Sequence, residues 1–145
     1  MRLFRTLRCK NCEKPTDFPS SILLGIERSP LRSSTGEPAI AIACPECKHV
    51  FPYIGSDLRL NHDDNPDQFA LPGGKSVFAI KIQCDDMSCE SRAEVRAIVE
   101  NELSKKGIFD TKLPSTLPEL ARSWTLHDIR CAESHPITAA RTINF

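Results

Sequence analysis

The spacing of the cysteines constrains this chain more than any other feature of its sequence. Seven cysteines occur in 145 residues, and four of them form two C-x-x-C pairs, Cys9 with Cys12 and Cys44 with Cys47. A tight turn between paired cysteines aims both sulfurs at one point, with amides of the turn directed at them. Two such pairs supply the four thiolates of a tetrahedral structural site, so we predict one four-cysteine zinc ion.

The remaining three cysteines and one histidine predict a second site. Cys84 and Cys89 form a C-x4-C pair, and Cys131 and His135 form a C-x3-H pair. Three thiolates with one imidazole are also a closed zinc-binding set, and this set accounts for the odd number of cysteines. We therefore expect two structural zinc ions per chain.

The cysteines also allow three other interpretations. Free cysteines are often small buried hydrophobic residues, an alternative that applies most to the second set with its looser spacing. A C-x-x-C pair can be a thioredoxin-like redox motif, but that motif expects a βαβ pattern, which the sequence lacks. Iron can replace zinc among four thiolates. Because aromatic residues make up only 6% of the chain, unlike the aromatic-rich rubredoxins, we favour zinc.

The local sequence around the second C-x-x-C pair adds a family resemblance. Residues 44–51, CPECKHVF, resemble the C-P-x-C-G/K-x-x-F signature of the zinc-ribbon family, whose knuckles are rubredoxin-like in their ligands. The resemblance implies a small tandem zinc-ribbon protein of a bacterial type, with an apolar residue packed under the metal. Lys48 stands where many zinc ribbons have glycine, and the first knuckle, CKNCEK, lacks that glycine too. The left-handed turn after each pair is therefore less favourable here.

The predicted fold class is small, β-rich and metal-stabilised, with two tandem zinc-ribbon-like units and short helical turns in the second. Residues 1–58 are expected to form a zinc ribbon with the four-cysteine site, residues 59–75 a polar linker, and residues 76–145 a second zinc-ribbon-like unit with the three-cysteine, one-histidine site. Units of this size have marginal cores and usually need a metal or disulfides.

Apolar runs and strand-like alternation place the secondary structure of these units. Strands are expected at residues 3–9, 39–44, 77–82 and 124–131, each leading into a cysteine. Residues 92–99 fit both helical and strand spacing, and we favour a strand that leaves the C-x4-C loop. Helical turns are expected at residues 101–106 and 115–122.

Charge and hydropathy exclude several classes of protein. The 19 Lys and Arg balance the 19 Asp and Glu, so bulk electrostatic binding of nucleic acid is not expected. No segment approaches the roughly 20 apolar residues of a membrane span, and the basic start lacks an apolar secretory segment. Metal-type cysteines then predict a location in the reducing cytoplasm.

Catalysis has little support in the sequence. Both predicted ligand sets are closed, whereas a hydrolytic zinc needs an open position, and the motifs H-x-E and G-x-S-x-G are absent. We expect that the protein is not an enzyme. His49, His62 and His127 receive no assigned role.

Two main functions follow from these features. The first is a protein-interaction or adaptor module whose unknown protein partner binds exposed loops or a strand edge such as residues 22–24. The alternative is a nucleic-acid-associated zinc ribbon of the transcription or translation machinery. A third, less favoured, function is an iron-binding rubredoxin-like electron carrier. The residues expected to contact nucleic acid are the basic residues near the start of the chain, Arg2, Arg5, Arg8 and Lys10, together with Phe4.

Overall fold

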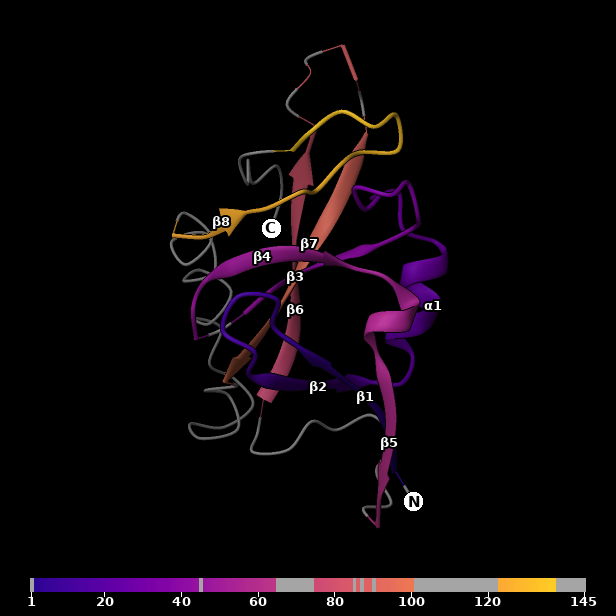
Figure 1. Cartoon of the computed structure of the whole chain (residues 1–145), viewed down its shortest axis with the longest axis vertical. Coiled ribbons are helices and arrows are strands. Elements are labelled where there is room, and N and C mark those ends of the chain that lie inside the picture. Colours follow the sequence, from indigo (N-terminus) through magenta and orange to yellow (C-terminus); the bar gives the residue numbers. More distant parts are fainter. Residues whose placement is uncertain are drawn as a thin grey trace, which may run out of the picture.

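The computed structural model describes residues 2–44, 46–64, 75–84, 86, 88–89, 91–100 and 123–137. Within these ranges the chain forms strands, one short α-helix and one turn of 3-10 helix (Figure 1). The elements are β1 (Arg2–Arg8), β2 (Pro15–Pro19), α1 (Ile22–Glu27), β3 (Ile40–Ala43), β4 (His49–Tyr53), η1 (Gly55–Asp57), β5 (Arg59–Asp63), β6 (Lys75–Gln83), β7 (Arg92–Glu100) and β8 (Thr125–Leu126).

The strands form two sheets. The smaller sheet has the order β2-β1-β5 and is antiparallel throughout. The larger sheet has the order β6-β7-β3-β4-β8, in which β3 runs parallel to β7 and β4 runs parallel to β8. In Figure 1 the ribbon of β1 and β5 extends away from the larger sheet at the end nearest the N-terminus.

The larger sheet joins strands from both of the intervals that the sequence analysis treated as units. Strands β3 and β4 come from residues 1–58, while β6, β7 and β8 come from residues 75–126. The first five residues of the predicted linker, residues 59–63, are not a linker but form β5, which pairs with β1. A two-stranded hairpin alone leaves both edges unpaired, and in the joint sheet β7 and β8 pair with the two edges of the β3–β4 hairpin.

The two faces of the larger sheet carry two separate cores. Strand β3 has the sequence IAIA and is buried along its whole length, with alanines towards one face and isoleucines towards the other. The alanine face packs with Ile80, Val95 and the C-terminal segment that contains Trp124. The isoleucine face packs with the smaller sheet and α1, through the buried residues Leu7, Phe18, Ile22 and Ile26.

Several predicted elements are confirmed and others differ. Strands β1, β3 and β6 end directly before Cys9, Cys44 and Cys84, and residues 92–99 are a strand, as favoured. The strand predicted over residues 124–131 is only the two residues of β8. The helical turns expected at residues 101–106 and 115–122 lie outside the described residues.

Residues 22–24, which the sequence analysis treated as a possible strand edge, lie in helix α1 instead. The local run of branched apolar residues is compatible with a strand. The burial of Ile22 and Ile26, four residues apart, selects the helix, because that spacing places both side chains on one helical face. Among the described residues no helix is long and apolar enough to cross a membrane.

Candidate metal centres

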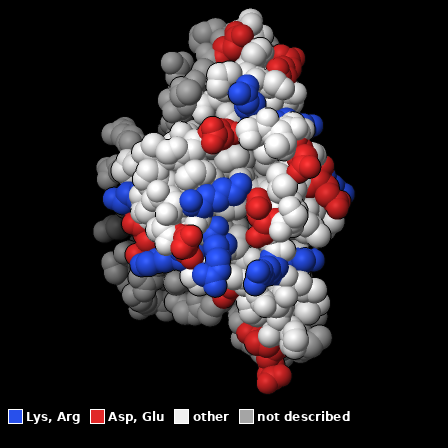
Figure 2. All heavy atoms as spheres, viewed as in Figure 1, with Lys and Arg blue, Asp and Glu red and all other residues white. Residues whose placement is uncertain are grey.

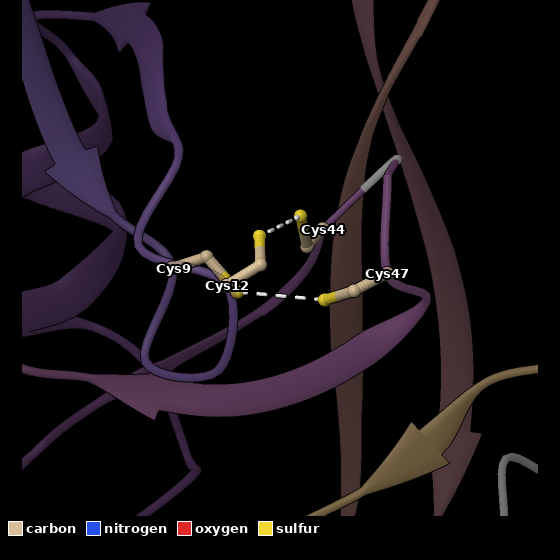
Figure 3. A group of neighbouring side chains, drawn as sticks. All are labelled: Cys9, Cys12, Cys44 and Cys47. Carbon is tan, nitrogen blue, oxygen red and sulfur yellow. Dashed lines mark hydrogen bonds between the residues drawn. The ribbon is translucent and has the colours of Figure 1, made fainter.

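The four cysteines of the first set converge from two loops. Cys9 and Cys12 lie in the loop between β1 and β2, and Cys44 and Cys47 lie in the loop between β3 and β4 (Figure 3). The four Sγ atoms all lie within 4.8 Å of one another, with 3.6 Å from Cys9 to Cys47 and 3.6 Å from Cys12 to Cys44. A Zn–S bond of about 2.3 Å gives tetrahedral S···S edges of about 3.8 Å, whereas a disulfide needs about 2.05 Å. The spacing fits four ligands around one ion.

The two loops of this first cluster have the same backbone geometry. In one loop Glu13 N donates to Cys9 O at 2.9 Å and Cys9 N donates to Lys14 O at 3.0 Å. In the other loop, Lys48 N donates to Cys44 O at 3.0 Å and Cys44 N donates to His49 O at 3.1 Å. Both loops are therefore knuckles of one type.

Each knuckle contains a residue in the left-handed region where zinc ribbons usually have glycine. The φ angles are 63° at Glu13 and 62° at Lys48. A side chain in this region costs about 1 kcal/mol, so the two knuckles are less stable without metal than their glycine versions would be. A bound ion offsets this cost.

Hydrogen bonds and burial give two thiols of the first cluster different pKa values. Burial raises the pKa of Cys44 to about 12. Burial also acts to raise the pKa of Cys47, but hydrogen bonds from the backbone of His49 and the side chain of Asn11 outweigh it and lower that pKa to about 7. Of these two thiols, Cys47 is the more readily ionised, and a metal ion that binds both must displace the proton of Cys44.

Two residues that the sequence analysis did not connect with the first cluster support its knuckle. The backbone N–H of Lys10 donates to the hydroxyl of Tyr53 at 3.2 Å, and Lys10 Nζ lies 5.0 Å from the centre of that ring. Lys10 Nζ also donates to Pro52 O at 2.7 Å and lies 3.5 Å from Asp57. These contacts attach the first knuckle to β4, and no local pattern in the sequence indicates them.

The second cluster brings together the β6–β7 loop and the C-terminal segment. Cys84, Cys89, Cys131 and His135 have ligand atoms within 4.8 Å of one another. Cys89 Sγ lies 3.9 Å from Cys131 Sγ, and Cys84 Sγ lies 3.7 Å from His135 Nδ1. Tetrahedral zinc with one imidazole gives edges of about 3.8 Å between sulfurs and about 3.6 Å between sulfur and nitrogen.

A short hairpin presents the last two ligands of the second cluster. Cys131 N donates to His135 O at 2.9 Å, and Ser134 N donates to Cys131 O at 2.9 Å. Ser134 has a φ of 67°, so this turn also contains a left-handed residue without glycine. The turn is one residue tighter than the knuckles of the first cluster.

Asp86 orients the imidazole of the second cluster and was missed by the sequence analysis. Its Oδ2 lies 3.7 Å from His135 Nε2, so the other ring nitrogen, Nδ1, faces the sulfurs. Asp86 Oδ1 accepts hydrogen bonds from the hydroxyl and the backbone N–H of Ser88 at 2.6 and 2.9 Å, and these bonds hold the pKa of Asp86 below its ordinary value. A carboxylate behind a ligating histidine is a common second layer of metal sites. The acidic residues of the C-x4-C loop were the available signal.

The structure thus gathers all eight predicted ligand residues into two groups of four that could each hold a metal ion. Each group has a complete tetrahedral ligand set, which suits a structural ion. The first group joins the smaller sheet to the larger one, and the second joins the β6–β7 loop to the C-terminal segment. An ion at either place would connect segments that are distant in the sequence.

The basic residues near the start of the chain do not share one surface. Because β1 alternates, Arg5 and Arg8 project from opposite faces of the smaller sheet. Arg8 Nη1 donates to Glu13 O at 3.3 Å, and Lys10 is engaged by the contacts around Tyr53. The side chain of Arg2 lies outside the described residues.

Two of the unassigned histidines form a pair. His49 Nδ1 and His127 Nε2 lie 2.6 Å apart, and the ring of His127 also stacks on Phe51 with 4.6 Å between ring centres. Together with the pairing of β4 and β8, these rings hold the start of the C-terminal segment on the larger sheet.

Comparisons of the chain with protein-family models, with curated proteins and with solved structures found no match.

Proposed function

We propose that the protein is a small structural-zinc protein that acts as a protein-interaction module. Support for zinc comes from the donor chemistry of the two groups, four cysteines in one and three cysteines with a histidine in the other. Zinc prefers closed tetrahedral sets of these ligands, and the spacings agree with its bond lengths. Iron accepts four thiolates as well, so metal analysis decides between them. Thiol ligands of this kind also favour a reducing compartment such as the cytoplasm.

Support for an interaction module comes from the ribbon of β1 and β5. Strand β5 is an edge of the smaller sheet, and its Leu60 is 54% exposed. Leu3 of β1 is 37% exposed, and the strand register places it on the same face as Leu60. An edge strand with exposed apolar side chains can receive an additional strand from another protein. This exposed edge is the observation that carries the proposal.

The side chain of Arg5 adds to the support for this interaction edge. Arg5 lies between Leu3 and Leu7 on the same face of β1, and its Nε is buried without a hydrogen-bond partner. A buried donor without a partner costs about 1 to 3 kcal/mol. A partner that supplies a carbonyl oxygen at this place would recover that cost.

Capture of partner proteins with matched variants tests the proposal. Leu60→Asp on the β5 edge is expected to abolish capture, because a charge prevents burial of this edge. Leu24→Asp is the control, since Leu24 is similarly exposed at 59% but lies on α1. Metal content of about two zinc ions per chain is expected for both variants. Equal capture by the two variants would contradict the proposed edge.

The nucleic-acid alternative stays a prediction with weaker support. Figure 2 shows basic side chains gathered across the middle of one face with acidic side chains among them, and Arg5 and Arg8 project from opposite faces. Retention on an oligonucleotide that falls steeply with salt would favour this alternative. The interaction proposal assigns no catalytic step to the chain.

A further inference from the structure

A pocket between α1 and the outer part of the larger sheet has no role in the metal centres or at the β5 edge. Its volume is about 460 Å³. Gly25 and Arg28 line it on the helical side, and Lys81, Arg92, Glu94 and Arg96 line it on the side of β6 and β7. Alternation along β7 places Arg92, Glu94 and Arg96 on one face, and Lys81 of β6 lies opposite Glu94 in the strand register.

The charges around this pocket are unbalanced. Four cationic side chains surround one carboxylate, although the whole chain is neutral. Within the part of the chain that the structure describes, none of the four cationic side chains has a hydrogen bond or an ion pair. Like charges placed together without partners repel, so this arrangement favours the binding of an anion.

The lack of a side chain at Gly25 leaves room for the guanidinium of Arg96. A Cβ on Gly25 would lie 2.5 Å from Arg96 Nη2 and 2.6 Å from Nη1, so the guanidinium lies directly against the helix backbone. Arg96 is half-buried and therefore has lost part of its hydration without gaining an ionic partner. A planar guanidinium in this position can make two parallel hydrogen bonds to a phosphate.

We propose that this pocket binds a small phosphorylated molecule of about nucleotide size. Arg96 holds its phosphate, with Arg28, Lys81 and Arg92 contributing further positive charge. Glu94 accepts a hydrogen bond from a hydroxyl or amino group of the same molecule, whereas its negative charge repels a bare phosphate ion. The pocket volume lies within the range of about 300 to 1,000 Å³ that small-molecule sites occupy.

Titration calorimetry on the full chain with its metal tests the proposal. The probes are inorganic phosphate, AMP, ATP and a single-stranded ten-nucleotide DNA. We expect a nucleotide to bind, and Arg96→Ala to weaken that binding at least tenfold. Gly25→Ala should weaken it as well, because the new methyl group displaces the guanidinium. Arg59→Ala, which removes an exposed positive charge on β5, is the control and should leave binding unchanged.

Two further variants keep the test independent of folding. Arg92→Ala removes an exposed side chain and should give a smaller loss of nucleotide affinity with unchanged metal content. Glu94→Gln removes the one negative charge and should strengthen the binding of inorganic phosphate. Equal losses with Arg59→Ala and Arg96→Ala, or no binding of any nucleotide, would overturn the proposal. Tighter binding of the DNA than of ATP would assign the pocket to a nucleic-acid backbone and overturn the small-molecule assignment.

Discussion

The two candidate metal centres assemble four ligand residues each by different means. The first is built from two knuckles with the same cysteine spacing and the same pattern of hydrogen bonds, and each has a left-handed residue at the same position. The second combines a wide C-x4-C loop with a tight C-x3-H turn, and its imidazole is oriented by Asp86. In the first centre, the regular spacing of the cysteines therefore sets the ligand geometry within each loop. The second centre depends in addition on the neighbouring carboxylate of Asp86.

The largest effects are expected when one ligand is removed from each centre in turn, because the two losses should differ in what they destabilise. Cys44→Ser should remove one ion and destabilise the contact between both sheets, since β3 lies inside the larger sheet. Cys131→Ser should remove one ion and release mainly the C-terminal segment. A structural zinc contributes on the order of 10 kcal/mol of apparent binding free energy. Metal content per chain and thermal unfolding check this, and two retained ions with full stability would contradict it.

The first centre should also show a change of pH dependence near pH 7. Cys44, with a pKa of about 12, holds its proton through this range, so metal binding displaces that proton and Cys44 contributes about a tenfold rise in affinity per pH unit. Below the Cys47 pKa of about 7, the proton of Cys47 must leave as well, so the dependence of affinity on pH steepens by about a further tenfold per unit.

Chelator competition between pH 6 and 8.5 measures this change of slope in the first centre. Asn11→Ala removes a hydrogen bond that lowers the pKa of Cys47, so the change of slope should move to higher pH. A single slope over the whole range would show that Cys47 is not distinguished from Cys44.

Removal of Asp86 should weaken the second centre alone. Asp86→Asn removes the charge that orients His135, and such a change typically lowers metal affinity about 10-fold to 100-fold. The control is Glu46→Gln at the first centre, where the exposed ion pair of Glu46 with Lys14 at 3.2 Å contributes about 0 to 1 kcal/mol. Equal losses of metal from the two variants would remove the distinction between the centres.

The smallest expected effect concerns the left-handed residues of the first centre. Lys48→Gly should raise the free energy of unfolding by up to about 1 kcal/mol, because glycine adopts a φ of 62° without strain. Glu13→Gly should act similarly in the other knuckle. Thermal unfolding of the metal-loaded protein measures both, and destabilisation would mean that these side chains make contacts that outweigh the strain.

Much of both centres was predictable because their information is local. The i, i+3 spacing of Cys9 with Cys12 and of Cys44 with Cys47 sets each knuckle within six residues. The apolar runs before these pairs and before Cys84 correctly predicted strands that deliver the ligands. The acidic residues of the C-x4-C loop did not by themselves indicate the role of Asp86, because that role depends on a histidine 49 positions away.

The sequence by itself determined the two ligand sets and the strands that lead into them, since turn geometry and strand alternation act over a few residues. Only the tertiary structure decided that β3 pairs in parallel with β7, that residues 22–24 are helical, and that Arg96 lies against Gly25. The pairing of β3 with β7 and the contact of Arg96 with Gly25 join segments more than 50 positions apart, and the helix depends on burial of Ile22 and Ile26 in the folded core. No local pattern specifies such partners.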